Sequence, residues 1–224
     1  MSAVIDRLPM RVMNPLFCVV AIDAIGMGAI LPSLPFYSQH FGASPFAIGA
    51  LVAVFSLGQI IAAPTLGKLS DRLGRKIVLV GSQLGTFASL VLLASAGNLL
   101  VVFLARIVDG VTSGNLSVAS AYAIDHSTPK NRRQAIGMIS AGVGVGMMVG
   151  PSLAAGLSHI SMTAPIWGAA LLSALSLVVN LIFLPNAEKH RTGDARPKTL
   201  SLRQTLRMPE ICSGLLGLRR TAAN

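Results

Sequence analysis

The sequence predicts an all-α membrane protein whose six transmembrane helices pack into one bundle. Of its 224 residues 53% are hydrophobic and only 12% are charged, which is about half of the charged share usual in soluble proteins. The apolar residues gather in six stretches, and a helix of roughly 20 apolar residues crosses about 30 Å of hydrocarbon. Lys and Arg fall in alternate connections between the stretches. Together these observations exclude an ordinary soluble domain.

Six helices are predicted in sequence, and local chemistry marks several of their ends. Pro32 and Pro35 are expected to bend or loosen the first helix near its outer end, because proline removes a backbone donor. The segment from Asp125 to Pro129 ends the fourth, since the residue before a proline avoids the helical region. Leu184-Pro185-Asn186 closes the sixth. The predicted spans are residues 15–36, 46–66, 77–96, 99–124, 134–158 and 163–184.

The basic residues predict the topology. Of the 18 Lys and Arg residues, 17 precede the first span, separate the second from the third or the fourth from the fifth, or follow the sixth. The connections near 37–45, 97–98 and 159–162 contain none. Cytoplasmic loops carry an excess of Lys and Arg, so both termini are predicted to be cytoplasmic. This placement leaves no basic folded face, so the net charge of +10 does not indicate nucleic-acid binding.

Three segments follow from this topology. Residues 1–14 form a cytoplasmic N-terminal tail, and residues 15–186 form the six-helix bundle. The bundle divides into two three-helix repeats, an arrangement found in many secondary transporters. Residues 187–224 form a basic cytoplasmic linker, in which Ile211 to Leu218 is apolar but too short to cross. This end is expected to be either the interrupted start of a seventh helix or an amphipathic tail.

Ionisable residues inside the spans are the first candidates for function. Asp23, Arg106 and Asp109 each cost about 2.5–3.5 kcal/mol at a helix centre, so they should face the bundle interior or a wet cavity. Arg106 and Asp109 share a helix face, either as a neutralising pair that fixes packing or with Arg106 tuning a carboxylate in a proton path. Asp23 has no basic residue one turn away, which favours a proton or cation site over a packing hydrogen bond. Gln59 is either a helix-helix contact or a substrate contact.

The connection between the second and third spans concentrates charge. Residues 67–76 read Gly-Lys-Leu-Ser-Asp-Arg-Leu-Gly-Arg-Lys, and Gly67 and Gly74 permit a tight turn with unusual dihedral angles. Asp71 is expected to cap the N-terminus of a neighbouring helix. Arg75 is expected to pair with a carboxylate such as Asp125. The alternative is that this segment is only a basic cytoplasmic anchor.

Glycines recur along the fifth span. Gly142, Gly146 and Gly150 are each four residues apart and form one smooth stripe, on which another helix can pack closely. Pro151 follows and allows a kink. The stripe is either simple helix packing or a flexible seam whose bending gates a pathway.

Four motifs together resemble one known family. Gly67-x-x-x-Asp71-Arg72-x-Gly74-Arg75-Lys76 resembles the signature loop of the major facilitator superfamily, and residues 106–110 are similar to its fourth-helix motif. Gly146-x-x-x-Gly150-Pro151 resembles the fifth-helix motif of its drug:proton antiporters. Residues 23–35 are similar to the first helix of its tetracycline-efflux members. One departure is Ala154-Ala155, which stands where the fifth-helix motif usually has a glycine pair.

The resemblance implies an antiporter of twelve helices in two bundles, which exports an amphipathic drug in exchange for protons by alternating access. By this likeness Asp23 and Gln59 contact substrate or proton, and Arg106 serves proton coupling. Asp71, Arg75 and Asp125 lock the inner gate. No cofactor is implied, because the proton gradient supplies the energy. The chain corresponds to the N-terminal half only, so transport needs the missing C-terminal half or a second copy.

The sequence leaves three classes of function to compare. The favoured one is proton-coupled efflux of a drug or small amphipathic metabolite across the cell membrane, inner or plasma, of the tetracycline- or multidrug-resistance type. The second is a truncated half-bundle that does not transport, or a membrane interaction protein. An intramembrane enzyme is disfavoured, because the sequence contains no HExxH or GxSxG motif and its four histidines lie in loops or at span ends.

Overall fold

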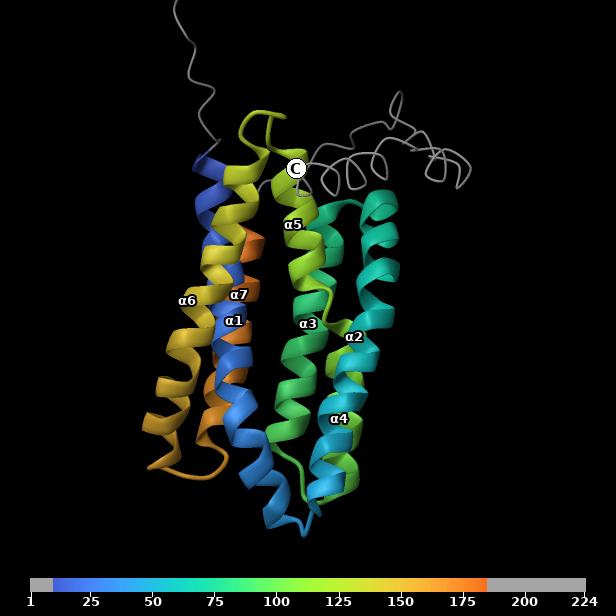
Figure 1. Ribbon diagram of the computed structural model, residues 1–224, viewed down its shortest axis with the longest axis vertical. Helices are drawn as coiled ribbons and strands as arrows, with labels where there is room; N and C mark the ends of the chain where they lie inside the picture. Colours follow the sequence, from blue (N-terminus) through green and yellow to red (C-terminus); the bar gives the residue numbers. More distant parts are fainter. Residues whose placement is uncertain (1–9, 185–224) are drawn as a thin grey trace, which may run out of the picture. The chain divides into compact units, whose positions relative to one another are not determined.

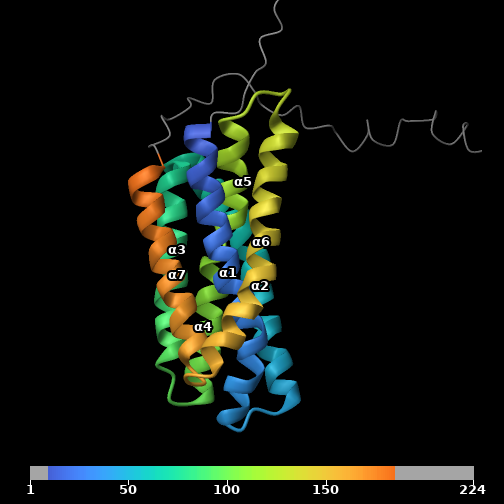
Figure 2. The same ribbon diagram turned by 90° about the vertical axis from the view of Figure 1, so that its left-hand side faces the viewer.

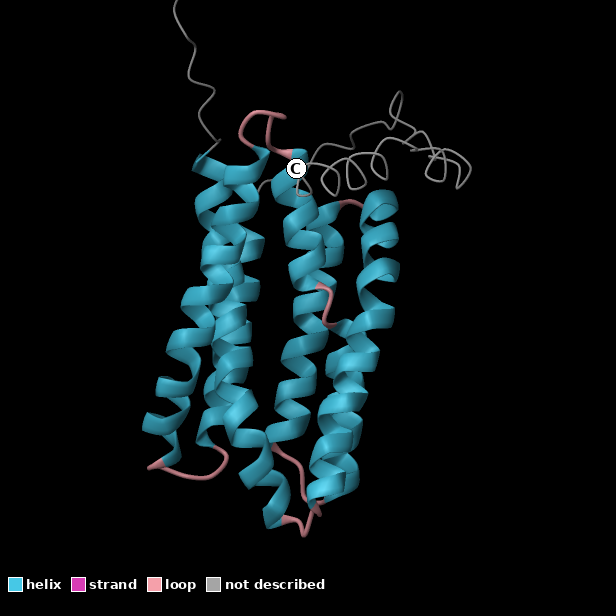
Figure 3. Ribbon diagram, in the orientation of Figure 1, coloured by secondary structure: helices cyan, strands magenta, loops and turns pink. Residues whose placement is uncertain are grey.

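The computed structural model describes residues 10–184, which contain seven α-helices and no strand (Figure 3). The chain divides into two compact units, Met1–Glu188 and Lys189–Asn224. The second unit, with its predicted linker and seventh-helix start, lies outside the described residues, as do residues 1–9. In chain order the helices are α1 Met10–His40, α2 Pro45–Leu73, α3 Arg75–Ala94, α4 Leu99–Thr112, α5 Asn115–Asp125, α6 Arg132–Ser158 and α7 Ala164–Phe183.

These helices confirm the predicted fold class. Within the described part of the chain, six spans are long and apolar enough to cross a membrane, with α4 and α5 together forming the fourth. Several ends differ from the prediction: α1 begins at Met10 rather than at residue 15 and runs through Pro32 and Pro35 to His40. Ser33 and Ser38 each donate their hydroxyl to the carbonyl four residues earlier, at 2.8 and 2.7 Å.

The predicted loop at residues 67–76 is largely helical. α2 continues to Leu73, and Gly74 alone separates it from α3. Gly74 has φ of 104°, a conformation that suits glycine, whereas Gly67 lies inside the helix, so the unusual dihedral angles predicted there are wrong. Leu, Lys and Arg between the two glycines are good helix formers, which explains why the helix does not end earlier.

The predicted fourth span is broken, which the sequence analysis did not foresee. α4 ends at Thr112 and α5 begins at Asn115, with Ser113 and Gly114 between them. The hydroxyl of Thr112 donates to the carbonyl of Val108 at 2.9 Å, and hydroxyls in this role compete with the helix for its backbone groups. Glycine is also a weak helix former. α5 then ends at Asp125, as predicted.

The packing crosses the boundary between the two predicted repeats. α1 packs on α6 and α7, whereas α2 and α3 pack on α4, and α3 also contacts α7. Figures 1 and 2 show α1, α6 and α7 together, beside the group of α2, α3, α4 and α5. The two three-helix segments are therefore interleaved in one bundle.

The core of the bundle consists of two clusters of buried apolar residues, and polar side chains lie between the two clusters. One cluster includes Leu16, Leu79 and Tyr122, and the other includes Leu34, Leu93 and Ile166. In α1 the first cluster takes residues 13–20 and the second residues 30–37, so position 23 lies between them. The α2–α3 and α5–α6 connections lie at the same end as the start of α1 (Figure 1). That this end faces the cytoplasm stays a prediction.

Candidate functional site

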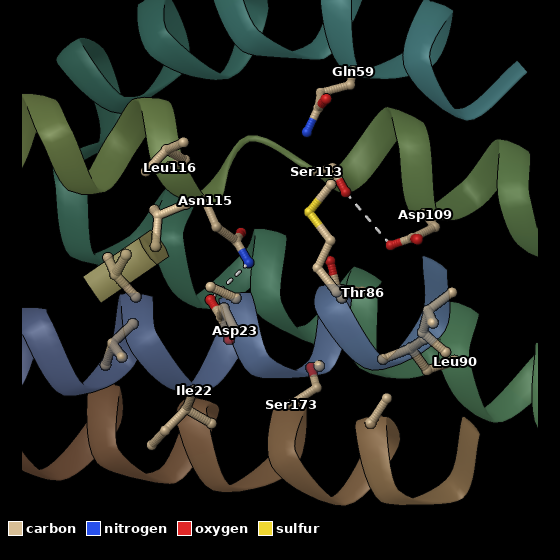
Figure 4. A pocket seen from close by; sticks show the side chains of 18 of the residues that line it. Ile22, Asp23, Gln59, Thr86, Leu90, Asp109, Ser113, Asn115, Leu116 and Ser173 are labelled. Atoms are coloured by element: carbon tan, nitrogen blue, oxygen red, sulfur yellow. Dashed lines mark hydrogen bonds between the residues drawn. The ribbon is translucent and has the colours of Figure 1, made fainter. Parts of the chain in front are cut away.

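A cavity of about 380 Å³ lies in the bundle and is lined by residues of all seven helices. Asp23 of α1, Gln59 of α2, and Arg106 and Asp109 of α4 all line it, so the structure brings together the four candidates singled out for substrate or proton binding. Figure 4 labels Asp23, Gln59 and Asp109. The rest of the lining is mostly apolar. Such a cavity, with few polar groups in an apolar wall, is typical of small-molecule sites.

Asp23 is held by amides. Its Oδ2 accepts hydrogen bonds from Asn115 Nδ2 at 3.1 Å and from Gln83 Nε2 at 3.4 Å. None of the ion pairs formed by residues 10–184 includes Asp23. Within the described residues Asp23 therefore has no ion partner on its own helix or on the helices packed around it, although Arg106 lines the same cavity.

The predicted pair of Arg106 and Asp109 is present. Arg106 Nη1 donates to Asp109 Oδ2 at 2.7 Å, and the two residues are only 4% and 7% exposed. The guanidinium carbon lies 4.0 Å from the ring centroid of Phe55, a favourable cation–π geometry. Ser113 donates its hydroxyl to the other oxygen of Asp109 at 3.4 Å. The pair is internally neutral, so Asp23 is the unbalanced charge of the cavity wall.

A second polar group was missed by the sequence analysis. Gln83 Nε2 donates to Ser176 Oγ at 2.6 Å, and Asn180 Nδ2 donates to Gln83 Oε1 at 2.6 Å. All three are buried, and they fasten α3 to α7 directly behind Asp23. The available signal was an amide within an otherwise apolar span, which was weighed for Gln59 but not for Gln83 or Asn180.

Several buried polar atoms of the cavity lining have no hydrogen-bond partner among residues 10–184. Buried groups of this kind are rare in folded proteins and call for an explanation. A ligand or water that enters the cavity would meet them at its wall. They are Thr86 Oγ1, Arg106 Nε, Asn115 Oδ1 and Ser173 Oγ.

A charge cluster lies at the end of the bundle where α2, α3 and α5 meet. Arg75 Nε donates to Asp125 Oδ2 at 2.9 Å, which confirms the predicted pair. Arg75 Nη2 also lies 2.6 Å from Asp71 Oδ1, and Nη1 donates to Ser70 Oγ at 2.5 Å. Among the described residues Asp71 thus pairs with Arg75 instead of capping another helix. We call Ser70, Asp71, Arg75 and Asp125 the gate cluster.

The other residues of the predicted motif surround this cluster. Gly67 contributes its carbonyl, which lies 3.5 Å from Arg75 Nη1. Lys76 Nζ donates to the carbonyl of Leu181 at 3.1 Å, in the last turn of α7. Arg72 is exposed. The motif therefore joins α2, α3, α5 and α7 through Arg75 and Lys76.

The glycine stripe of α6 packs against α1, as a helix-packing seam requires. Gly142, Gly146 and Gly150 are all buried. A Cβ at Gly146 would lie 2.3 Å from Ala24 Cβ, and one at Gly150 would lie 2.7 Å from Gly28 Cα. The two backbones are in contact here, and only glycine permits this approach.

The helix continues beyond the stripe. Pro151 is exposed and lies inside α6, which runs on to Ser158. Ala154 is 3% exposed, so a methyl group is accommodated one turn beyond Gly150. Bending of this seam as a gate stays a prediction.

Comparison with known proteins agrees with the motifs. A family profile described as Major Facilitator Superfamily matches residues 16–220. Over 184 residues the chain is 36% identical to the "Tetracycline resistance protein, class C" of Escherichia coli, covering 81% of this chain and 46% of that protein. It is 28% identical to "Multidrug resistance protein 1" of Bacillus subtilis (strain 168), covering 75% of this chain and 44% of that protein. The chain spans about half the length of the relatives it matches.

Solved structures share the fold. The human organic anion transporter MFSD10 (TETRAN) superimposes with a TM-score of 0.72 at 25% identity, covering 80% of this chain and 49% of that one. A bacterial homologue of the human lysosomal transporter Spinster, in an inward-facing and unoccupied conformation, gives a TM-score of 0.68 at 19% identity, covering 89% of this chain and 49% of that one. The second likeness concerns the fold alone.

Proposed function

Because the chain belongs to the major facilitator superfamily, we propose that it forms the N-terminal half of a secondary active transporter that exports a drug or small amphipathic metabolite in exchange for protons. The chain is a multi-pass membrane protein of a transporter family and not an enzyme. The proton gradient is the proposed source of energy, with no cofactor.

The observation that carries this proposal is Asp23, a carboxylate at the wall of a mostly apolar cavity that forms no ion pair with any other described residue. A carboxylate at this depth is expensive to keep ionised, so it gains from binding a proton or a cationic ligand. The apolar wall suits the hydrophobic part of an amphipathic molecule. One residue can thus take either a proton or a substrate, which antiport requires.

Arg106 and Gln59 have supporting roles in the proposal. Arg106 neutralises Asp109 and presents its unpartnered Nε as a donor to the cavity. Gln59 extends its amide from α2 toward the cavity (Figure 4). The gate cluster closes the proposed cytoplasmic end through Arg75.

Transport by alternating access needs a second bundle opposite the first. The relatives are about twice as long as the part that they share with this chain. We propose that full transport needs a second bundle, supplied by a C-terminal half like that of the relatives or by a second copy of this chain.

The test uses the 224-residue chain, reconstituted in liposomes with an imposed proton gradient. We expect uptake of tetracycline, and proton flux stimulated by it, with the Asp23→Asn variant losing both. The matched control is Asp71→Asn, which removes a carboxylate outside the cavity and should keep the affinity for tetracycline measured in detergent. Proton-driven uptake that persists in Asp23→Asn would refute the assignment. Tetracycline binding without uptake would favour the alternative, a half-bundle that does not transport alone.

A further inference from the structure

The break between α4 and α5 is fastened by one side chain from a third helix. Ser82 of α3, which is 3% exposed, donates its hydroxyl to the carbonyl of Thr112 and accepts from the N–H of Gly114 at 3.4 Å. A helix end in a membrane leaves backbone groups that need partners. Ser82 provides partners on both sides of the break, so α5 is joined to α4 through hydrogen bonds that can exchange.

The first residue of α5 contacts the proposed proton site. Asn115 Nδ2 donates to Asp23 Oδ2 at 3.1 Å, as Figure 4 shows. A hydrogen bond to an ionised carboxylate is roughly twice as strong as one between neutral groups. The attachment of α5 to α1 therefore depends on the charge of Asp23.

The last residue of α5 belongs to the gate cluster. Asp125 accepts from Arg75 Nε at 2.9 Å. α5 has 11 residues, so about 16 Å separates its two ends. One short helix, broken from its neighbour at Gly114, thus connects the carboxylate in the cavity with the ion pair at the end of the bundle.

No other charge competes with Asp23 at this contact. Among the described residues that line the cavity, the charged ones are Asp23, Arg106 and Asp109, and the latter two are paired with each other. Helices α2, α3, α5, α6 and α7 contribute only uncharged side chains to the described lining. A change in the charge of Asp23 is therefore felt chiefly by its hydrogen-bond donors, which are Asn115, Gln83 and Ser176.

We propose that α5 couples the cavity to the gate: Asn115 is a positioning residue that holds α5 while Asp23 is ionised, and neutralisation of Asp23 by a proton or a cationic ligand frees α5 and weakens the Asp125–Arg75 pair. This rests on the proposed function of Asp23. It adds Asn115, and a connection through α5, to the residues that the sequence motifs identify.

The test is a double-mutant cycle between the two ends of α5. Spin labels on Leu73→Cys and Lys130→Cys, both exposed positions, report the distance between the end of α2 and the α5–α6 connection in the full chain, with Cys18 and Cys212 replaced by serine. Residues this far apart normally contribute additively. We expect Asn115→Leu and Asp125→Asn each to shift the equilibrium between distance populations by about tenfold or more, as for loss of a hydrogen bond to a charge.

If α5 couples the two sites, the equilibrium between distance populations shifts no further in the double variant than in either single variant. Asn115→Leu should also abolish the response of the measured distance to acidification. The matched control is Ser117→Leu, an exposed position on the same helix, which should keep the wild-type response. Asn115→Ala serves as a smaller substitution if Asn115→Leu fails to fold. Additive shifts, or an unchanged acid response in both Asn115 variants, would overturn the proposal.

The distance measurement separates the two proposals. Coupled shifts in a chain that does not take up tetracycline would contradict the proposed transport and leave the role of Asn115 intact. Transport with additive shifts would contradict the role of Asn115 alone.

Discussion

Adding one methyl group at Gly146 should destabilise the bundle, while the same change at Gly144 should not. The new Cβ at position 146 would lie 2.3 Å from Ala24 Cβ and 2.7 Å from the amide nitrogen of Ile25. Ordinary contact begins at 3.4 Å, so α1 and α6 would have to separate by about 1 Å. The obstacle is largely backbone, which has no alternative rotamer. Overpacking of this kind costs about 1–3 kcal/mol.

The assay is thermal unfolding of the detergent-solubilised chain, followed by circular dichroism. For a protein of this size 1 kcal/mol corresponds to about 2–4 °C in Tm, so Gly146→Ala should lower Tm by about 2–12 °C. At Gly144 no atom lies within 4 Å of the added Cβ, and alanine is the better helix former. Gly144→Ala should therefore leave Tm unchanged or raise it slightly. Equal Tm values for the two variants would refute the description of the seam as a close backbone contact.

Two further predictions concern buried charge and the turn at Gly74. Arg106→Met leaves Asp109 buried without its ion partner and should cost about 3–5 kcal/mol, whereas Arg106→Met combined with Asp109→Leu should recover most of that loss; a double variant as unstable as the single one in thermal unfolding would contradict this. Gly74→Ala forces a side chain into φ of 104° and ψ of 141°, which glycine adopts far more readily than alanine, and should cost about 1–3 kcal/mol. Gly81→Ala, where the added Cβ meets no atom within 4 Å, is the control and should be neutral or slightly stabilising in the same assay.

The spans were predictable because hydropathy and basic residues act locally along the chain. The sixth span was predicted at 163–184 and is Ala164–Phe183 in the structure. The second was predicted to end at residue 66 and continues to Leu73, because charged residues can extend a helix beyond the hydrocarbon while adding nothing to its apolar length. The sequence therefore indicates where the apolar segment ends and not where the helix ends.

The break in the fourth span depends on a contact between distant residues. Thr112, Ser113 and Gly114 weaken a helix only slightly by themselves. Ser82, about 30 positions earlier in the sequence, donates to the carbonyl of Thr112 and accepts from the N–H of Gly114, which also donates to the carbonyl of Thr112 at 2.8 Å. The contact between Ser82 and the α4–α5 break cannot be predicted from the residues around the break alone.

The charged half of the candidate site was predictable and its amide half was not. Asp23, Arg106 and Asp109 are conspicuous because an ionisable group in hydrocarbon is expensive. The uncharged amides of Gln83 and Asn180 cost less free energy in hydrocarbon than an ionised group does, so they are less conspicuous in the sequence. Their importance follows from the packing of α3 on α7, which places one amide against the other at 2.6 Å.

The two contacts that hold α1 and α5 in place differ in kind, and this difference indicates where the bundle can move. α1 meets α6 backbone to backbone at Gly146 and Gly150, so sliding or opening there requires whole helices to separate. α5 is held at its start by the hydrogen bonds of Ser82 with Gly114 and of Asn115 with Asp23. Its Val118, Ala119, Tyr122 and Ala123 also pack into an apolar cluster. Bending at the glycine stripe was one interpretation of the sequence. That interpretation stays a prediction; from the close packing at Gly146 and Gly150 and the break at Ser113 and Gly114 we expect motion at the joint between α4 and α5 instead.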